Sequence, residues 1–167
     1  MCAVIAGLCL ISSCFVGCGS GSADRNWTLK KFEDGNFAIR FPSDTKKQVT
    51  DTATGKMTQY LCERWHGAYI AGYMDIPKTD ASTRKIVIQE FAKHFAKGMK
   101  SKIEDQKTDQ TGGQFQVDTQ LSGKVEGVLR IKTSGNRLYF LVACWDKGWE
   151  DDFDSSYFVD SFEILGS

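Results

Sequence analysis

The segment from Leu138 to Trp145 constrains the fold more than any other part of the chain, because all eight of its residues are apolar or aromatic. Side chains of a β-strand point alternately to opposite faces of its sheet, so a strand that is apolar at every position must be covered on both faces. A turn sequence, Ser134-Gly-Asn136, comes shortly before the segment. The pattern therefore predicts a central strand with a further layer of structure on either side.

Other segments have the features of antiparallel strands. Asp34-Gly35 is a strong signal for a hairpin turn, and His66-Gly67 is expected to form a second one. Further along the chain, two segments alternate apolar and polar residues, which is typical of strands with one exposed face. The predicted strands, besides the central one, span residues 27–32, 37–41, 57–65, 68–75, 115–121, 125–131 and 162–165.

Between these strands the apolar period changes to that of a helix. Apolar residues recur every four positions from Val87 through Met99 to Ile103, which predicts a long amphipathic helix that begins near a cap at Asp80 or Ser82. A short second helix is expected at residues 150–158, where three acidic residues lie in the first turn. The predicted class is α+β, with an antiparallel sheet of about six to seven strands sandwiched between the long helix and the short C-terminal helix.

The N-terminal segment is expected to be an export signal. Residues 2–23 carry no charge and begin with an apolar run, yet this run is too diluted by Gly and Ser for a good membrane span. Residues 11–14 and 15–18 both resemble the lipobox of bacterial lipoproteins. We expect Cys18, or alternatively Cys14, to be acylated; an uncleaved anchor or a buried helix is the other interpretation. The chain then divides into a signal (1–17), a tether (18–26) and one domain (27–167), membrane-anchored on the periplasmic or surface side of the bacterial envelope.

Two cysteines, Cys62 and Cys144, remain in the predicted domain. In an oxidising compartment a disulfide between them is one expectation, and closing so long a loop would stabilise the fold by about 4–5 kcal/mol in the chain-entropy model. Two separate buried thiols are the alternative, because cysteine is among the most buried residue types whether bonded or not.

The charge pattern argues against a nucleic-acid partner and leaves a protein or membrane partner open. The chain has 21 basic and 21 acidic residues, whereas phosphate-directed binding needs a basic excess. Locally, residues 84–102 hold six basic side chains and one acidic, and residues 146–163 hold seven acidic and one basic. The helix face and the loop from Trp145 to Asp154 are therefore candidate contact surfaces, although such runs commonly serve only solubility.

Two groups of side chains are candidate binding sites. Glu63, His66 and Asp75 are a candidate metal site if the second hairpin brings them together, although their spacing is not that of known zinc sites. No hydrolase, phosphate-loop or zinc-protease motif is present, so we expect no cofactor and lean against an enzyme. A candidate ligand or partner cleft is formed by aromatic residues, which can equally be core: Tyr60, Trp65, Tyr69, Tyr73, Trp145 and Trp149.

The order of these parts resembles the PsbP-like family. The resemblance is carried by the early Phe37-Ala-Ile-Arg-Phe-Pro42, the mid-chain helix, Gly123-Lys-Val-Glu-Gly127, Asn136-Arg-Leu-Tyr-Phe-Leu141 and the closing Phe158-Val-Asp-Ser-Phe162. It implies an antiparallel sheet between helices and a role in binding or assembly, without a catalytic site. Two functional hypotheses follow: a lipid-anchored module that binds an envelope protein, or a small-molecule or metal-binding module, with or without enzymatic activity, that uses the aromatic residues near Trp65 and Trp145.

Overall fold

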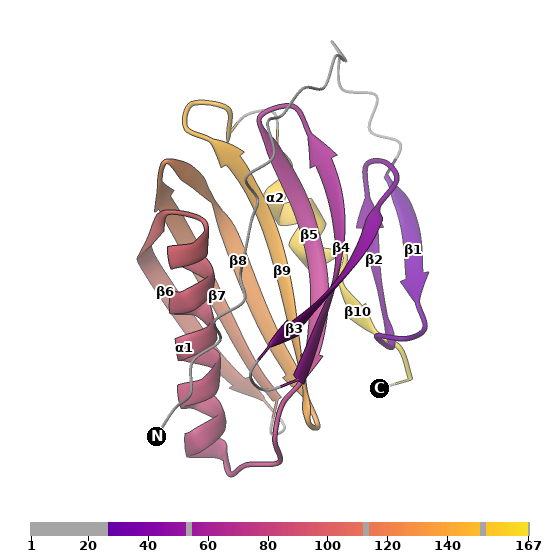
Figure 1. The fold of residues 1–167 in the computed structure, drawn as a ribbon, viewed down its shortest axis with the longest axis vertical. Coiled ribbons are helices and arrows are strands. Elements are labelled where there is room, and N and C mark those ends of the chain that lie inside the picture. The colour runs from indigo at the N-terminus through magenta and orange to yellow at the C-terminus, as the bar shows by residue number, and fades with distance from the viewer. Residues whose placement is uncertain (1–26, 53–54, 112–113, 151–152, 167) are drawn as a thin grey trace.

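The computed structural model of the chain describes residues 27–52, 55–111, 114–150 and 153–166, so the predicted signal and tether, with Cys14 and Cys18, lie outside the described residues. A seven-stranded sheet has the order β3-β4-β5-β9-β8-β7-β6, and a three-stranded sheet has the order β1-β2-β10 (Figure 1). All paired strands are antiparallel. The elements are β1 (Thr28–Phe32), β2 (Phe37–Phe41), β3 (Lys46–Thr52), β4 (Gly55–Arg64), β5 (Gly67–Asp75), α1 (Ala81–Gly98), β6 (Ser101–Thr111), β7 (Gln114–Gly123), β8 (Val125–Ser134), β9 (Arg137–Asp146), α2 (Ser155–Asp160) and β10 (Glu163–Ile164).

The predicted central strand is confirmed as β9, which has three strands of the large sheet on either side. Its side chains alternate between two separate hydrophobic clusters. Leu138, Phe140 and Val142 lie in the cluster that α1 completes, whereas Tyr139 and Leu141 lie in the cluster on the opposite face. The large sheet is therefore covered on both faces along β9, as its uniformly apolar sequence requires.

Helix α1 covers the first face, against β6, β7 and β8 (Figure 1). The Asp80 carboxylate caps it by accepting hydrogen bonds from the backbone N–H groups of Ser82 and Thr83, at 2.9 and 3.0 Å. The prediction that the helix continues to Ile103 is wrong. The helix ends at Gly98, Lys100 adopts a left-handed backbone conformation with φ +57°, and Ile103 belongs to β6.

The second face is covered by the three-stranded sheet together with α2. Phe37, Ile39 and Phe41 of β2 share one cluster with Phe158 and Val159 of α2. The predicted α+β class with a large antiparallel sheet is confirmed, but the early hairpin pairs with β10 instead of joining the large sheet. The short helix begins five residues later than predicted because Asp154 caps it and accepts a hydrogen bond from the Tyr157 N–H group.

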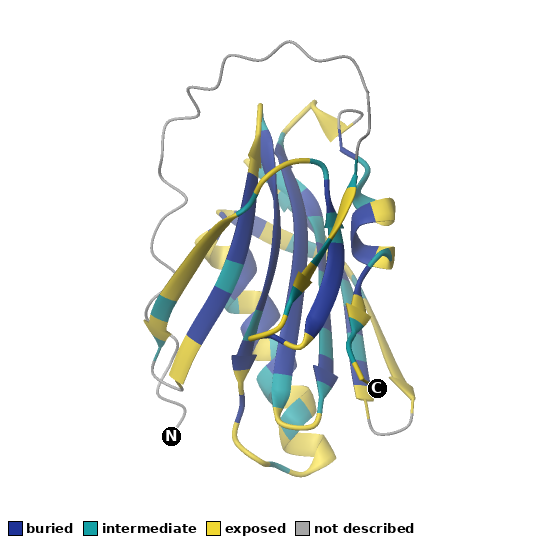
Figure 2. Cartoon of the chain, turned by 90° about the vertical axis from the view of Figure 1, so that its right-hand side faces the viewer, coloured by how far each residue is buried: buried dark blue, intermediate teal, exposed yellow. Residues whose placement is uncertain are grey.

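The sequence prediction missed the two edge strands, β3 and β6. Both are rich in polar and charged residues, and most of their side chains are exposed. An edge strand pairs on one side only, and charged side chains there oppose pairing with another chain. Figure 2 shows that the buried residues are concentrated in the inner strands.

Asp34, in the turn between β1 and β2, joins the small sheet to the large one. The Tyr60 hydroxyl donates to both of its carboxylate oxygens, at 2.6 and 2.7 Å, and the Lys47 ammonium group donates at 2.6 Å. Burial alone would raise the pKa of Asp34, but the hydrogen bonds from Lys47 and Tyr60 outweigh it and lower this pKa below its usual value. The charged carboxylate therefore stabilises the junction between the sheets.

Candidate functional site

The structure divides the six aromatic candidates into two groups. Four of them belong to the hydrophobic cluster on the second face: Tyr60, Tyr69, Tyr73 and Trp145. Trp145 is only 9% exposed and stacks against Phe153 at 5.6 Å between ring centroids. The other two candidates, Trp65 and Trp149, are exposed. Most of the predicted aromatic cleft is therefore part of the core.

Trp65, His66 and Trp149 form an exposed group that we call the tryptophan patch. The Trp149 ring stacks on the His66 ring, with 3.9 Å between the ring centroids and 13° between the ring planes. The Trp65 ring also neighbours His66, with 5.5 Å between the ring centroids. The backbone fixes this arrangement, because Asp146 N–H donates to the His66 carbonyl at 2.7 Å and Trp149 N–H donates to the Asp146 carbonyl at 3.1 Å. His66 itself adopts φ +60° in the turn.

The predicted metal site at Glu63, His66 and Asp75 is wrong, because these residues do not come together. Glu63 and His66 lie at the turn between β4 and β5, whereas Asp75 is at the far end of β5. Glu63 accepts a hydrogen bond from Lys46 at 2.6 Å, and Asp75 accepts one from Arg137 at 2.7 Å. Among the described residues, no group of three His, Cys, Asp or Glu side chains is placed to hold a metal ion.

The expected disulfide is also wrong. Cys62 and Cys144 are both free and buried, and they lie in different hydrophobic clusters on opposite faces of the large sheet. The Cys62 thiol lies 3.1 Å from the Ser43 hydroxyl, and the Cys144 thiol donates to the Ala68 carbonyl at 3.6 Å. Burial raises the pKa of both thiols, to about 12 for Cys144, so both remain protonated at neutral pH.

A polar groove lies beside α2 on the second face. Helix α2 packs on β9, β8 and β2, so the second face of β6 and β7 is left outside the cover that α2 and the small sheet provide. The groove has a volume of about 230 Å³ and is lined by Asp105 and Lys107 of β6, Asp118, Thr119 and Gln120 of β7, Val128, Leu129 and Arg130 of β8, and Ser155, Ser156 and Val159 of α2. We call it the α2 groove.

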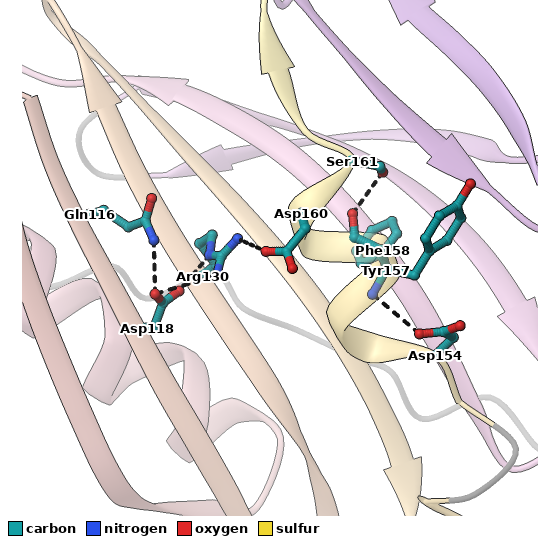
Figure 3. Close-up of polar contacts among 8 residues, drawn as sticks. All are labelled: Gln116, Asp118, Arg130, Asp154, Tyr157, Phe158, Asp160 and Ser161. Atoms are coloured by element: carbon teal, nitrogen blue, oxygen red, sulfur yellow. Dashed lines mark hydrogen bonds and ion pairs between the residues drawn. The ribbon is translucent and has the colours of Figure 1, made fainter.

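Arg130 forms the fixed centre of the α2 groove. Its guanidinium group donates to Asp118 through Nε at 2.5 Å and to Asp160 of α2 through Nη1 at 2.6 Å (Figure 3). The side chain is only 17% exposed. Burial alone would lower the pKa of Arg130, but the hydrogen bonds to the two carboxylates outweigh it and raise this pKa. Arg130 thus ties β7, β8 and α2 together and stays charged.

Lys132 lies two residues beyond Arg130 on the same face of β8, but it is not held between two carboxylates as Arg130 is. It is half-buried, and the described residues give its ammonium group no ion pair; the nitrogen lies 5.6 Å from the centre of the Phe162 ring. Burial lowers the pKa of Lys132 and the nearby positive charge of Arg130 lowers it further, and together they outweigh the opposite effect of the Asp118 and Asp160 carboxylates. A cation in this environment favours an additional carboxylate beside it.

The sequence contained a signal for this groove. Two neighbouring strands carry polar residues at every second position, Gln116 and Asp118 in one and Arg130 and Lys132 in the other, while the positions between them are mostly apolar. This pattern predicts a polar sheet face, but only the register that pairs Asp118 with Arg130, and the placement of α2 above them, forms the groove.

No protein-family model and no curated protein matches this chain. A solved structure, the solution structure of cyanobacterial PsbP (CyanoP) from Synechocystis sp. PCC 6803, matches 90% of this chain and 99% of its own, with a TM-score of 0.53 and 12% identical residues. The chain has a PsbP-like fold.

This finding confirms the resemblance that the sequence motifs indicated. The PsbP-like fold accounts for the large antiparallel sheet and its two covers, but at 12% identity it assigns no role to any residue. The α2 groove and the tryptophan patch are therefore interpreted from the residues of this chain alone.

Proposed function

We propose that this chain is a lipid-anchored, exported PsbP-like domain that binds a protein partner of the cell envelope without catalysing a reaction. The lipobox-like residues that end at Cys18, or at Cys14, support the anchor and the location. Neither described helix has the length and apolar character of a membrane span. In this proposal the acylated cysteine before residue 27 is the anchor, and the domain presents its surfaces to an envelope protein.

The observation that carries the binding proposal is the half-buried Lys132 beside the α2 groove, which has no ion pair among the described residues. An ammonium group that is partly removed from water and lacks an ion pair among the described residues is unfavourable in the free domain. A partner carboxylate that reaches Lys132 would relieve this penalty on binding. The proposed partner therefore presents an acidic side chain to the end of the groove.

The rest of the α2 groove suits recognition because its charges are already held in place. Arg130 engages both Asp118 and Asp160, so these groups need little reordering when a partner binds. The same pairing occupies both carboxylates, which makes them poor candidates for a general base. Among the surfaces that the sequence predicted, the loop from Trp145 to Asp154 leads directly into α2, whereas α1 lies on the opposite face of the sheet.

Site-directed photocrosslinking tests the binding surface. A photoreactive amino acid is placed at Gln120, an exposed residue that lines the groove, and in a matched control at Lys85, an exposed residue of α1. In cells that make the full chain, we expect a discrete adduct with one envelope protein from Gln120 and none from Lys85. The absence of an adduct from Gln120, or the same adduct from both positions, would contradict the proposal.

The intact mass of the protein isolated from membranes tests the anchor separately. We expect a chain that begins at an acylated Cys18 or Cys14. An unmodified chain that begins at Met1 would contradict both the anchor and the proposed location.

A further inference from the structure

The tryptophan patch is a second exposed surface, separate from the α2 groove. Trp65 is 53% exposed and Trp149 is 44% exposed, although large aromatic side chains are usually better covered. Backbone hydrogen bonds hold the two turns that carry these tryptophans, so the side chains are exposed in the folded domain itself. Exposed tryptophans on a rigid support are typical of protein interfaces and of the membrane–water interface.

The chain enters the domain at the same end as the patch. The ring of Trp27, the first described residue, lies 5.1 Å from the Tyr69 ring and 5.2 Å from the Tyr157 ring. Tyr69 belongs to β5, two residues after the start of that strand, and the turn before it carries the patch. Figure 1 shows the start of β1 and the turn between β4 and β5 at one end of the molecule.

The length of the preceding segment limits how far this end can lie from an anchor. Eight residues separate Cys18 from Trp27. Even a fully extended chain of this length spans only about 30 Å, which is less than the thickness of a bilayer with its headgroups. An acyl chain on Cys18 therefore holds the tryptophan patch near the membrane surface.

We propose that the tryptophan patch docks into the headgroup region of the membrane to which the chain is anchored, so that the α2 groove on the second face stays accessible to a partner. This inference rests on the lipid anchor of the proposed function. Indole rings favour this depth of the bilayer because they combine apolar area with an N–H donor.

Charge around the patch indicates which lipids suit it. Glu63 is paired with Lys46, Asp146 lies beside His66, and the exposed Arg64, Lys147 and Glu150 have mixed signs. This is not the cluster of four or more basic residues that attracts anionic lipid. Docking is therefore expected on zwitterionic vesicles and is expected to persist at high salt.

Fluorescence quenching by lipid tests the docking. The full acylated chain is reconstituted into phosphatidylcholine–phosphatidylethanolamine vesicles that contain lipids brominated on the acyl chain at a shallow or a deep position. The chain has four tryptophans, of which Trp145 is buried. In a Trp27→Phe background, which removes the tryptophan where the chain enters the domain, we expect shallow bromines to quench the fluorescence more than deep ones, and the double variant Trp65→Phe, Trp149→Phe to lose this quenching. A control adds Ile86→Trp, on exposed α1, to the double variant and should remain unquenched.

The outcomes separate docking from anchoring. If the protein floats with the vesicles but the wild type is not quenched, the docking is refuted while the anchor stands. Equal quenching in the wild type and the double variant also refutes the docking. The docking is likewise refuted if a protein, and not lipid, protects Trp65 and Trp149 in native membranes. If the protein does not float with the vesicles, the anchor itself is refuted, and the docking with it.

Discussion

Replacing Lys132 by methionine should stabilise the free domain. Methionine keeps an apolar side chain of similar shape, with its sulfur at the δ position of the lysine chain, beside the Phe162 ring whose centre lies 5.6 Å from the present ammonium nitrogen. The substitution removes a cation whose pKa is lowered first by burial and then by the charge of Arg130. A lowered pKa of a lysine means that folding disfavours its charged form, so the charge destabilises the domain at neutral pH.

The expected gain is small because water still reaches the half-buried ammonium group. We expect roughly 0.5–1 kcal/mol in the free energy of unfolding, the usual gain when an unfavourable functional group is removed. For a domain of this size that is an increase of about 1–4 °C in Tm. Thermal unfolding followed by circular dichroism measures the shift. The matched control is Lys85→Met on the exposed face of α1, which should leave Tm unchanged. A fall in Tm of Lys132→Met by more than about 2 °C would refute the argument, because Lys132 would then stabilise the fold.

Three further predictions concern stability. Arg130→Leu should lower the free energy of unfolding by about 1–3 kcal/mol in denaturant titrations. The loss is smaller than for a fully buried ion pair, because the side chains of Asp118 and Asp160 are 40% and 65% exposed and regain contact with water. An unchanged unfolding midpoint would contradict the role of Arg130. Tyr60→Phe should cost about 1–2 kcal/mol at pH 7, since the carboxylate that it contacts is 38% exposed. Because the pKa of Asp34 is lowered on folding, this stabilisation is present above its unfolded pKa and lost as pH falls below about 4, so the two proteins should converge in acid. Reductant should leave Tm unchanged, because Cys62 and Cys144 are unpaired, and a clear decrease would contradict their placement.

The parts of the fold that sequence patterns predicted are those in which the pattern has a local cause. Asp34-Gly35 forms the turn of the first hairpin, and Asp80 caps α1. The continuous apolar run at 138–145 lies in the central strand and is buried on both faces, under α1 on one side and under the small sheet with α2 on the other. These residues reflect backbone geometry and burial within a few positions of themselves.

The errors have a different origin, since they depend on contacts between distant residues. Met99 and Ile103 continue the spacing of the helix, but the left-handed conformation of Lys100 turns the chain into β6. Cys62 and Cys144 are two free thiols because the register of β4, β5 and β9 places them on opposite faces of the sheet.

The α2 groove could not be predicted for the same reason. Arg130 meets Asp118 only through the register of β7 and β8, and it meets Asp160 only once α2 has packed on the sheet. The sequence could show a polar strand face, but not what lies above it.

The central claim, that the α2 groove binds a partner through Lys132, is tested most directly by photocrosslinking from Gln120 in the Lys132→Met background. We predict that the adduct formed by the otherwise wild-type chain is strongly reduced by Lys132→Met and retained by Lys85→Met, at equal protein levels. An adduct of undiminished yield in the Lys132→Met chain would contradict the claim, because the partner would then bind without the Lys132 cation.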